Sequence, residues 1–569
     1  MSRGFVNGRL RSVLATALFL AGCAGSPSSE ASVATPTLKW DRGGCFASWC
    51  QTGWYSSPSV ADIDGDGQQE IIWGSYDIVS LTGATGALEW RAEHANRVFA
   101  GTVVADLTGN GSLEVIAGRN SDNLMVYDHN GTLLWTRHPF GTGEVRTLAV
   151  ADLDGDGVME IIAGGFVNPR QVAVYDPAGT IRSGWPARRS GEPGYGAGLF
   201  NQNVAVGDMD GDGTLEVFAT TDSHYINAFD DHGNQLTVNP MYTGRTYWSQ
   251  VGIHVDHQVD LRGYANCGVE HRPNFADAAP TIADVNGDGT PEVVVVGNVY
   301  NCGTNPYTSL YHIPFIFNLD RSRWSGNGFD WTVVPTPPPN ASPKSEDWNV
   351  IQTAVNSVVV ADLDNDGLQE ILFPSYDGRL HAYWLDKTQH GAWPYTVPAT
   401  GSGGDTFRFA SEPTVADLDG DGNAEVIFTS WPKNAVTQSG DLIILDSLGH
   451  QLQRVALPGP TGSWNGALAA PTLADVDGDG ELEVVLGTTS YGVVVFDLPG
   501  VPATARILWG TGRGNFQRTG QPLSVAPGHT LAISSPTPAS EGDSGLGTLS
   551  FGVTLDGPTE AAPIPSRSE

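Results

Sequence analysis

Asp62-Ile-Asp-Gly-Asp-Gly-Gln-Gln-Glu70 is the stretch that decides the fold, because its pattern Asp-x-Asp-x-Asp-Gly-x-x-Glu returns, with small changes, eight times along the chain. A unit repeated every few tens of residues is typical of a repeat architecture. We number the copies acidic loops 1 to 8 in chain order. Their first residues are Asp62, Asp106, Asp152, Asp208, Asp284, Asp362, Asp417 and Asp475.

The composition of each acidic loop suits calcium. In loop 1, carboxylates occupy positions one, three, five and nine, and a backbone carbonyl is available at position seven. Calcium takes six to eight oxygen ligands, and glycine at position six permits the sharp turn that folds them inward. The alternative is a metal-free acidic turn that is stabilised by Asx hydrogen bonds.

The sequence around the loops distinguishes them from EF-hands. An EF-hand places its last carboxylate at position twelve and continues into a helix. Here each Glu is followed by a short apolar run, such as Ile71-Ile-Trp73, and another apolar run precedes each first Asp. Such runs predict β-strands, so each acidic loop is expected to join two strands.

The copies differ in their number of carboxylates. Loops 1, 3, 4, 6, 7 and 8 keep the full set, loop 5 has Asn286, and loop 2 has Thr108 and Asn110 and should be the weakest site. The predicted calcium ligands are Asp62, Asp64, Asp66, Gln68, Glu70; Asp106, Glu114; Asp152, Asp154, Asp156, Val158, Glu160; Asp208, Asp210, Asp212, Thr214, Glu216; Asp284, Asn286, Asp288, Thr290, Glu292; Asp362, Asp364, Asp366, Leu368, Glu370; Asp417, Asp419, Asp421, Asn423, Glu425; Asp475, Asp477, Asp479, Glu481 and Glu483.

These loops and their flanking strands resemble FG-GAP and VCBS-type repeats, best known from the β-propeller head of integrin α subunits. The resemblance covers residues 38–522. It implies an all-β propeller of four-stranded blades, with calcium in the loop between the first two strands of each blade. Eight blades are expected, or seven if loop 2 or a terminal repeat does not belong to a full blade. Residues 507–509 are expected to end the last blade.

One further motif lies between the expected third and fourth strands. Residues 81–90 end in Trp90 and are similar to the tryptophan-docking motif of quinoprotein dehydrogenases. The motif is not expected in every blade, because the fourth and seventh blades lack the tryptophan. The adjacent cysteines of that family are absent too.

The two ends of the chain differ from the repeats. Arg3, Arg9 and Arg11 precede a short apolar run that ends in Leu20-Ala-Gly-Cys23, which resembles a bacterial lipobox. The resemblance implies a signal peptide at 1–22, a lipid on Cys23 and anchoring at the bacterial outer membrane or cell surface; an ordinary secretory signal is the alternative. Residues 23–37 are predicted to form a flexible tether. The tail 523–569 contains a partial Calx-β-like segment and is predicted to be poorly ordered.

Charge and cysteines narrow the class of protein. There are 63 acidic and 29 basic residues, which argues against nucleic acid as a partner. Five cysteines in an exported chain favour disulfides. With Cys23 assigned to the anchor, the predicted pairs are Cys45–Cys50 and Cys267–Cys302, the latter because blade topology places both on one face.

Long insertions identify the predicted ligand surface. They cover 240–277, 298–311 and 321–353 and are expected on the face opposite the acidic loops. Candidate ligand-binding residues there are Trp248, His254, His257, Tyr264 and His271. The alternative is that such aromatic residues pack the insertions onto the propeller.

Two functions remain open. The first is a non-catalytic, calcium-stabilised surface adhesion protein that binds a glycan or a protein through the insertions. The second is a calcium-dependent polysaccharide lyase, which would need a base and a cation beside a uronate. No catalytic residue is predicted, because no nucleophile or cofactor motif is present in the sequence.

Overall fold

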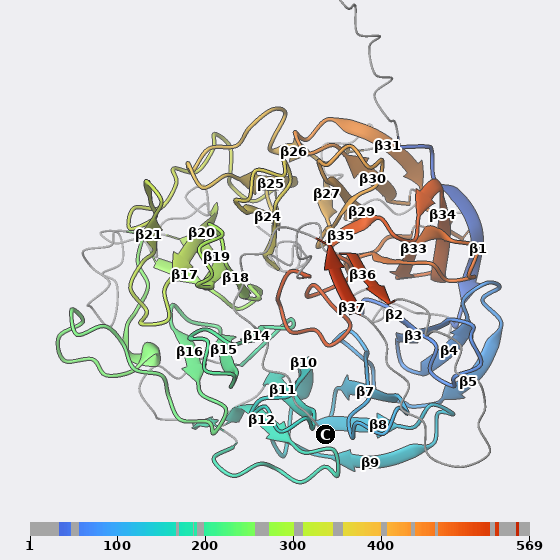
Figure 1. The fold of residues 1–569 in the computed structure, drawn as a ribbon, viewed down its shortest axis with the longest axis horizontal. Helices are drawn as coiled ribbons and strands as arrows, with labels where there is room; N and C mark the ends of the chain where they lie inside the picture. Colours follow the sequence, from blue (N-terminus) through green and yellow to red (C-terminus); the bar gives the residue numbers. More distant parts are fainter. Residues whose placement is uncertain are drawn as a thin grey trace, which may run out of the picture.

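The fold is a ring of eight small antiparallel β-sheets, seen down its axis in Figure 1. The structure is a computed structural model that describes residues 33–46, 56–166, 170–185, 187–189, 198–255, 272–300, 311–344, 357–399, 407–433, 439–460, 465–523, 530–533 and 553–556. The chain is therefore an eight-bladed β-propeller, as the sequence predicts. In the described part of the chain, no helix is long and apolar enough to span a membrane.

The first four blades follow the chain from the centre of the ring outward. Blade 1 comprises β2 (Ser59–Ala61), β3 (Glu70–Gly74), β4 (Ile78–Thr82) and β5 (Leu88–Ala92). Blade 2 comprises β6 (Val103–Ala105), β7 (Glu114–Arg119), β8 (Asn123–Tyr127) and β9 (Leu133–Arg137). Blade 3 comprises β10 (Glu144–Ala151), β11 (Glu160–Phe166), β12 (Arg170–Tyr175) and β13 (Ala187–Arg189). Blade 4 comprises β14 (Val204–Gly207), β15 (Glu216–Thr220) and β16 (Ile226–Phe229), followed by the 3₁₀ turn η2 (Trp248–Gln250).

The remaining blades carry the longer excursions. Blade 5 comprises β17 (Arg272–Asn274), β18 (Thr281–Ala283), β19 (Glu292–Tyr300) and β20 (Tyr311–Phe317), with the hairpin β21 (Ser325–Gly326) and β22 (Phe329–Asp330). Blade 6 comprises β23 (Val359–Ala361), β24 (Glu370–Ser375), β25 (Arg379–Tyr383) and β26 (Tyr395–Thr396). Blade 7 comprises β27 (Phe407–Ala410), β28 (Thr414–Asp417), β29 (Glu425–Lys433), β30 (Asp441–Leu445) and β31 (Gln451–Ala456). Blade 8 comprises β32 (Thr472–Ala474), β33 (Glu481–Thr488) and β34 (Gly492–Pro502).

The outermost strand of blade 8 comes from the other end of the chain. β1 (Thr37–Gly43) pairs antiparallel with β34, so that Leu38 lies opposite Phe496. The expectation that residues 507–509 end the last blade is therefore wrong. Those residues belong to β35 (Arg506–Trp509), which pairs with the innermost strand β28 of blade 7.

The hydrophobic core lies between the blades. Eight clusters of buried apolar side chains are present among the described residues, and each cluster joins two neighbouring blades. The cluster of blades 8 and 1, for example, contains Val485 and Val495 from one blade and Trp73 and Val79 from the other. Because both faces of each sheet are covered, the strands are apolar on both faces, as the uninterrupted apolar runs in the sequence require.

A second contact between blades is made by tryptophan. Among the described residues, seven blades have an indole Nε1 that donates a hydrogen bond to a backbone carbonyl in the turn after the third strand of the next blade. The pairs are Trp40 with Gly83, Trp90 with His129, Trp135 with Pro177, Trp185 with Asp231, Trp248 with Leu319, Trp331 with Leu385, and Trp393 with Ser447. The fourth blade, which lacks the tryptophan at the expected place in sequence, receives it from η2 inside an insertion.

The centre of the ring is filled by residues 506–523, which we call the axial segment. Figure 1 draws its strand β35 near the centre of the ring. Backbone N–H groups of Val150, Val206 and Ile282, on the inner strands of blades 3, 4 and 5, donate to carbonyls of Gln517, Thr519 and Gly520. The fully buried Arg518 donates to the carbonyls of Ser57, Thr102 and Gly512.

The described insertions run along the outer side of blades 4 to 6. The Asn327 side chain donates to the carbonyl of Asn286 in acidic loop 5, whereas Lys344 N–H bonds to Tyr376 in the β24–β25 connection on the opposite face. Similarly, the Tyr242 hydroxyl donates to the carbonyl of Arg321 and Ile253 N–H to that of His224, at opposite ends of their blades. The prediction that all these insertions lie on the face opposite the acidic loops is therefore wrong for the described parts of 240–277 and 321–353; 301–310 lie outside the described residues.

The ends of the propeller differ in part from their predicted boundaries. Val33 is buried, and its carbonyl accepts a hydrogen bond from the Gln453 side chain, so packing on the propeller begins inside the predicted tether. Near the C-terminus, β36 (Thr530–Ile533) pairs with β37 (Val553–Asp556). Residues 1–32 and the rest of the tail beyond 523 lie outside the described residues.

Candidate functional site: acidic loops and a surface pocket

All eight acidic loops join the innermost strand of a blade to the second strand, as predicted, and share one hydrogen-bonding scheme. In blades 5 and 7 two short strands, β17 and β18 or β27 and β28, pair with the same second strand, β19 or β29, and count together as the innermost strand; β20 and β30 are then the third strands. The carboxylate at position nine accepts a bond from the backbone N–H at position two, at 2.7–3.1 Å in every loop. The first aspartate accepts from the glycine N–H at position six, as Asp62 does from Gly67 at 3.0 Å. Gly67 has φ +88°, a conformation that favours glycine. These bonds hold the carboxylates around one point.

Carboxylate oxygens converge in most of the loops. Groups of three acidic residues with ligand atoms within 4.8 Å of one another occur in loops 1, 3, 4, 6 and 7, among others: Asp62, Asp64, Asp66; Asp152, Asp154, Glu160; Asp208, Asp210, Asp212; Asp362, Asp364, Glu370; and Asp417, Asp419, Glu425. Oxygen atoms gathered in this way suit a hard divalent cation.

The pKa values of several position-nine glutamates are raised. Burial, opposed by the backbone hydrogen bond and reinforced by the neighbouring aspartates, raises the pKa of Glu370 to about 9 and that of Glu292 and Glu425 to about 8. The pKa of Glu70 and Glu216 rises to about 7 for the same reasons. A cation placed among the carboxylates would favour their charged forms and so oppose these shifts.

Loop 6 gives the most direct indication of a missing ligand. The Glu370 side chain is fully buried, and its Oε2 accepts from Leu363 N–H at 2.7 Å. Its Oε1 is buried too, but has no hydrogen-bond partner, and the same holds for Oδ1 of Asp364. Buried carboxylate oxygens without partners are costly, and a cation would satisfy both. The residues of loop 6 therefore fit calcium.

Loop 2 keeps the same backbone with fewer carboxylates. Asp106 accepts bonds from the backbone N–H groups of Thr108, Asn110 and Gly111, and Glu114 accepts from Leu107. Asx hydrogen bonds are thus sufficient to shape an acidic loop, and the additional carboxylates of the other loops are not needed for its conformation.

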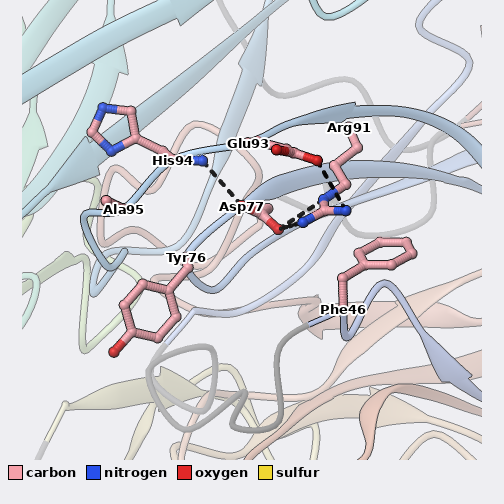
Figure 2. A pocket seen from close by; sticks show the side chains of 7 residues that line it. All are labelled: Phe46, Tyr76, Asp77, Arg91, Glu93, His94 and Ala95. Atoms are coloured by element: carbon pink, nitrogen blue, oxygen red, sulfur yellow. Dashed lines mark hydrogen bonds and ion pairs between the residues drawn. The ribbon is translucent and has the colours of Figure 1, made fainter.

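A pocket of about 520 Å³ opens on blade 1, on the face opposite the acidic loops. Figure 2 shows Phe46 beside Arg91, with Asp77 and Glu93 on the guanidinium and Tyr76, His94 and Ala95 along the rim. The Arg91 guanidinium lies 4.4 Å from the Phe46 ring centroid and forms ion pairs with Asp77 at 2.8 Å and Glu93 at 3.2 Å. Phe46 is 47% exposed.

The sequence does not reveal this pocket, because its residues come from three separate segments: after β1, after β3, and from the end of β5 onward. None of them belongs to a recognisable motif. Only the exposure of a phenylalanine distinguishes the site, and exposure is a property of the folded chain.

The predicted ligand-binding residues do not form a surface site where the structure describes them. Trp248 is 1% exposed and His254 is fully buried, with its ring against that of His224. Trp248 docks on blade 5, so both residues pack the insertion onto the propeller, and their assignment as ligand contacts is corrected. His257, Tyr264 and His271 lie outside the described residues.

Cysteine placement is described for one residue. Cys45 is disulfide-bonded. Its predicted partner Cys50 lies outside the described residues, as do Cys23, Cys267 and Cys302.

Similarity to known proteins is consistent with the fold. A family model described as an FG-GAP-like repeat matches residues 104–163 and 362–428. No curated protein matches the chain.

Similar solved structures include the biofilm matrix protein Bap1 of V. cholerae (15% identity, 86% of this chain and 96% of that chain, TM-score 0.45). Others are the rhamnogalacturonan lyase PL11 of Bacillus licheniformis (17%, 80% and 75%, 0.43) and the exotype rhamnogalacturonan lyase YesX (16%, 86% and 81%, 0.47). Likeness at this level carries no argument about ligand or activity. The chain is an eight-bladed β-propeller that carries FG-GAP-like repeats.

Proposed function

We propose that the protein is a calcium-stabilised binding protein of the bacterial cell surface, non-catalytic, anchored through a lipid on Cys23, with a glycan as its ligand. The observation that carries the calcium part is the pair of buried, unpartnered oxygens of Glu370 and Asp364 at the centre of a carboxylate cluster. The lipobox-like sequence before Cys23 supports the anchor.

Calcium acts here as a structural ion. It supplies positive charge to the cavity formed by positions one, three, five and nine, where the carboxylates otherwise repel one another. The chain as a whole has a formal net charge of −34, so the benefit of bound cations is not restricted to one loop. Metal that binds only the folded state stabilises it by mass action.

The pocket on blade 1 is the surface best suited to a glycan. An exposed aromatic ring offers an apolar face for a sugar, and the nearby carboxylates and guanidinium offer hydrogen bonds to its hydroxyl groups. Two carboxylates face one guanidinium, and burial together with Arg119 lowers the pKa of His94, which keeps that ring neutral. The charge therefore favours a neutral glycan over a polyuronate.

Thermal melting with and without a calcium chelator tests the structural role of calcium. We expect the melting temperature to fall on chelation and to recover when calcium, but not potassium, is added back. Identical melting curves in both conditions would refute the proposal.

Incubation with a panel of neutral and acidic polysaccharides in calcium tests the ligand. We expect retention on a neutral glycan that is lost in Phe46→Ala and kept in the control Phe166→Ala, an exposed phenylalanine of blade 3. Size profiles of the same samples test catalysis: shortened chains would establish a lyase and refute the non-catalytic assignment.

The anchor is tested in the expressing bacterium. We expect radioactive palmitate to label the protein and the protein to fractionate with membranes, and both to be abolished in Cys23→Ser. A soluble, unlabelled wild-type protein would refute the anchor.

A further inference from the structure

We propose that acidic loops 3 and 8 are neutralised by a basic side chain of the protein itself and take no calcium, so that calcium binding is confined to other loops. The inference rests on the proposed calcium function and divides the eight loops into two kinds. Counting carboxylates alone ranks loops 3 and 8 among the best calcium sites.

In loop 8 the cation is Lys39. Its Nζ lies 2.5 Å from Oδ2 of Asp477 and 3.2 Å from Oε1 of Glu483, at loop positions three and nine. A third carboxylate, Asp497 on β34, lies at 2.8 Å. The side chains of Lys39 and Glu483 are 14% and 1% exposed, so the ammonium sits among carboxylates that are largely removed from water.

In loop 3 the cation is Arg182. Its two terminal nitrogens reach Oδ2 of Asp154 and Oε1 of Glu160, each at 2.7 Å. These carboxylates again occupy positions three and nine, so the guanidinium bridges the same two ligands as Lys39 does in loop 8. A planar guanidinium matches such a pair of carboxylates well.

The two basic residues occupy equivalent places in their blades. Lys39 follows Leu38, which pairs with Phe496 near the end of the third strand of blade 8. Arg182 follows Ile181, which pairs with Tyr175 at the end of the third strand of blade 3. Although the two residues lie on unrelated segments of the chain, each blade brings this position over its own acidic loop.

In five other blades the strand pairing identifies the equivalent residue, and that residue is not basic. Phe496 and Tyr175 each lie opposite the residue that follows the position-nine glutamate of their blade. Applied to the other blades, the same criterion places Glu89 at this position in blade 1, Leu134 in blade 2, Leu236 in blade 4, Trp324 in blade 5 and Leu452 in blade 7. None of these side chains is basic, so this position supplies no positive charge to the acidic loops of these five blades.

A fixed ammonium or guanidinium excludes calcium in two ways. It pairs with one oxygen of the carboxylate at position three and one at position nine, which calcium would need as ligands, and it repels a divalent ion at close range. Although Oδ1 of Asp154 stays buried without a hydrogen-bond partner, the guanidinium beside it already supplies positive charge. Lys39 lies on β1, the strand that closes the ring, and its bond to Asp497 lies outside the loop. Closure at blade 8 therefore does not depend on calcium.

The test is the number of calcium ions per chain, measured by elemental analysis after desalting from calcium buffer. We expect Lys39→Met and Arg182→Met each to bind one ion more than the wild type, because each vacates a complete carboxylate set. The control Leu452→Met changes the same position of blade 7 without changing charge and should match the wild type.

A reverse variant keeps the test decisive if either methionine variant fails to fold. Leu236→Arg places a guanidinium over loop 4 and leaves both natural ion pairs intact; we expect one ion fewer than in the wild type. Unchanged stoichiometry in folded Lys39→Met and Arg182→Met, or in Leu236→Arg, would overturn the inference. A wild type that binds no calcium would instead refute the proposed calcium function.

Discussion

At the scale of single residues, the most informative side chain is Glu370. It is completely buried, one of its oxygens shapes the loop through Leu363 N–H, and the other has no partner. The first oxygen serves the conformation of the loop, and the second is available to a ligand. A substitution that keeps the oxygen bonded to Leu363 N–H but removes the negative charge separates the effect on loop conformation from the effect on ligand binding.

Glu370→Gln is that substitution. Its amide oxygen can still accept from Leu363, so we expect little change in stability without calcium, where burial already raises the pKa of this carboxyl to about 9. In calcium we expect the variant to lose about 2–3 kcal/mol of metal-dependent stabilisation. Melting with and without chelator measures the difference. Glu114→Gln in the carboxylate-poor loop 2 is the matched control and should leave the calcium response unchanged.

The buried His312 is expected to make the free energy of unfolding depend on pH, independently of the acidic loops. Burial is the main cause that lowers the pKa of His312 to about 3; the charge of Asp377 opposes this shift, and His381 adds to it. The Nδ1 atom of His312 lies 3.1 Å from Ser375 Oγ. The folded protein keeps this ring neutral, whereas the unfolded chain protonates it below its ordinary pKa of 6.5. Its contribution is therefore fully present above pH 6.5 and is lost as pH falls toward 3, by about 2 kcal/mol at pH 5.

Urea unfolding between pH 5 and pH 7 checks this expectation. We expect His312→Gln to be less stable than the wild type at pH 7, through lost packing, but to have a flatter dependence on pH. His390→Gln changes a histidine that is 40% exposed and should stay close to the wild-type slope; a wild-type slope in His312→Gln would contradict the assignment.

At the scale of elements, the blades are joined by apolar clusters and by the indole hydrogen bonds between neighbours. Each of these bonds links the outer part of one blade to the turn after the third strand of the next. Blade 4 obtains its tryptophan from an insertion, which shows that the contact, and not the position in sequence, is what recurs.

Trp331→Phe tests the value of one such bond. Trp331 is fully buried and donates to Leu385 at 2.9 Å, so phenylalanine keeps most of the packing but leaves a buried carbonyl without its donor. We expect a loss of about 1–3 kcal/mol in chemical denaturation. Tyr395→Phe removes an exposed bond to Gln451 and should cost less than about 0.5 kcal/mol; equal losses would contradict the reasoning.

The elements also show how far the sequence predicts the structure. The acidic loops, their flanking strands and the number of blades follow from local patterns, because each loop carries its own turn chemistry between two apolar runs. Pairings between distant segments do not follow from such patterns: nothing near Lys39 indicates that β1 joins β34, and nothing near Trp248 indicates that its indole reaches Leu319. The pocket of Phe46 and Arg91 is hidden for the same reason.

At the scale of the whole molecule, the axial segment is hydrogen-bonded to blades in different parts of the ring. Arg518 alone donates to carbonyls at the start of blades 1 and 2, and Arg513 donates to carbonyls of Val204 and Pro280 in blades 4 and 5. The segment thus replaces a solvent channel by a hydrogen-bonded centre.

Arg518→Met tests this centre. Methionine fills a similar volume but leaves several buried carbonyls without donors, so we expect a loss of at least about 3 kcal/mol and a cooperative transition at lower denaturant for all blades together. Arg506→Met removes a single bond to the carbonyl of Gly422 in a half-buried setting and should cost about 1 kcal/mol or less. A small loss in Arg518→Met would show that the axial segment is dispensable.

The axial segment also fixes an order of events during synthesis. β1, the strand that closes the ring, is synthesised before the blades. It cannot pair until β34, more than 450 residues later in the sequence, has also been made. The residues that fill the centre, 506–523, leave the ribosome after every blade. The blades can form one after another as the chain lengthens, but the ring becomes a single cooperative body only after residues 506–523 have been made. Until then the inner strands expose unpaired backbone groups, so a nascent or prematurely terminated chain is the form of this protein most in need of chaperones.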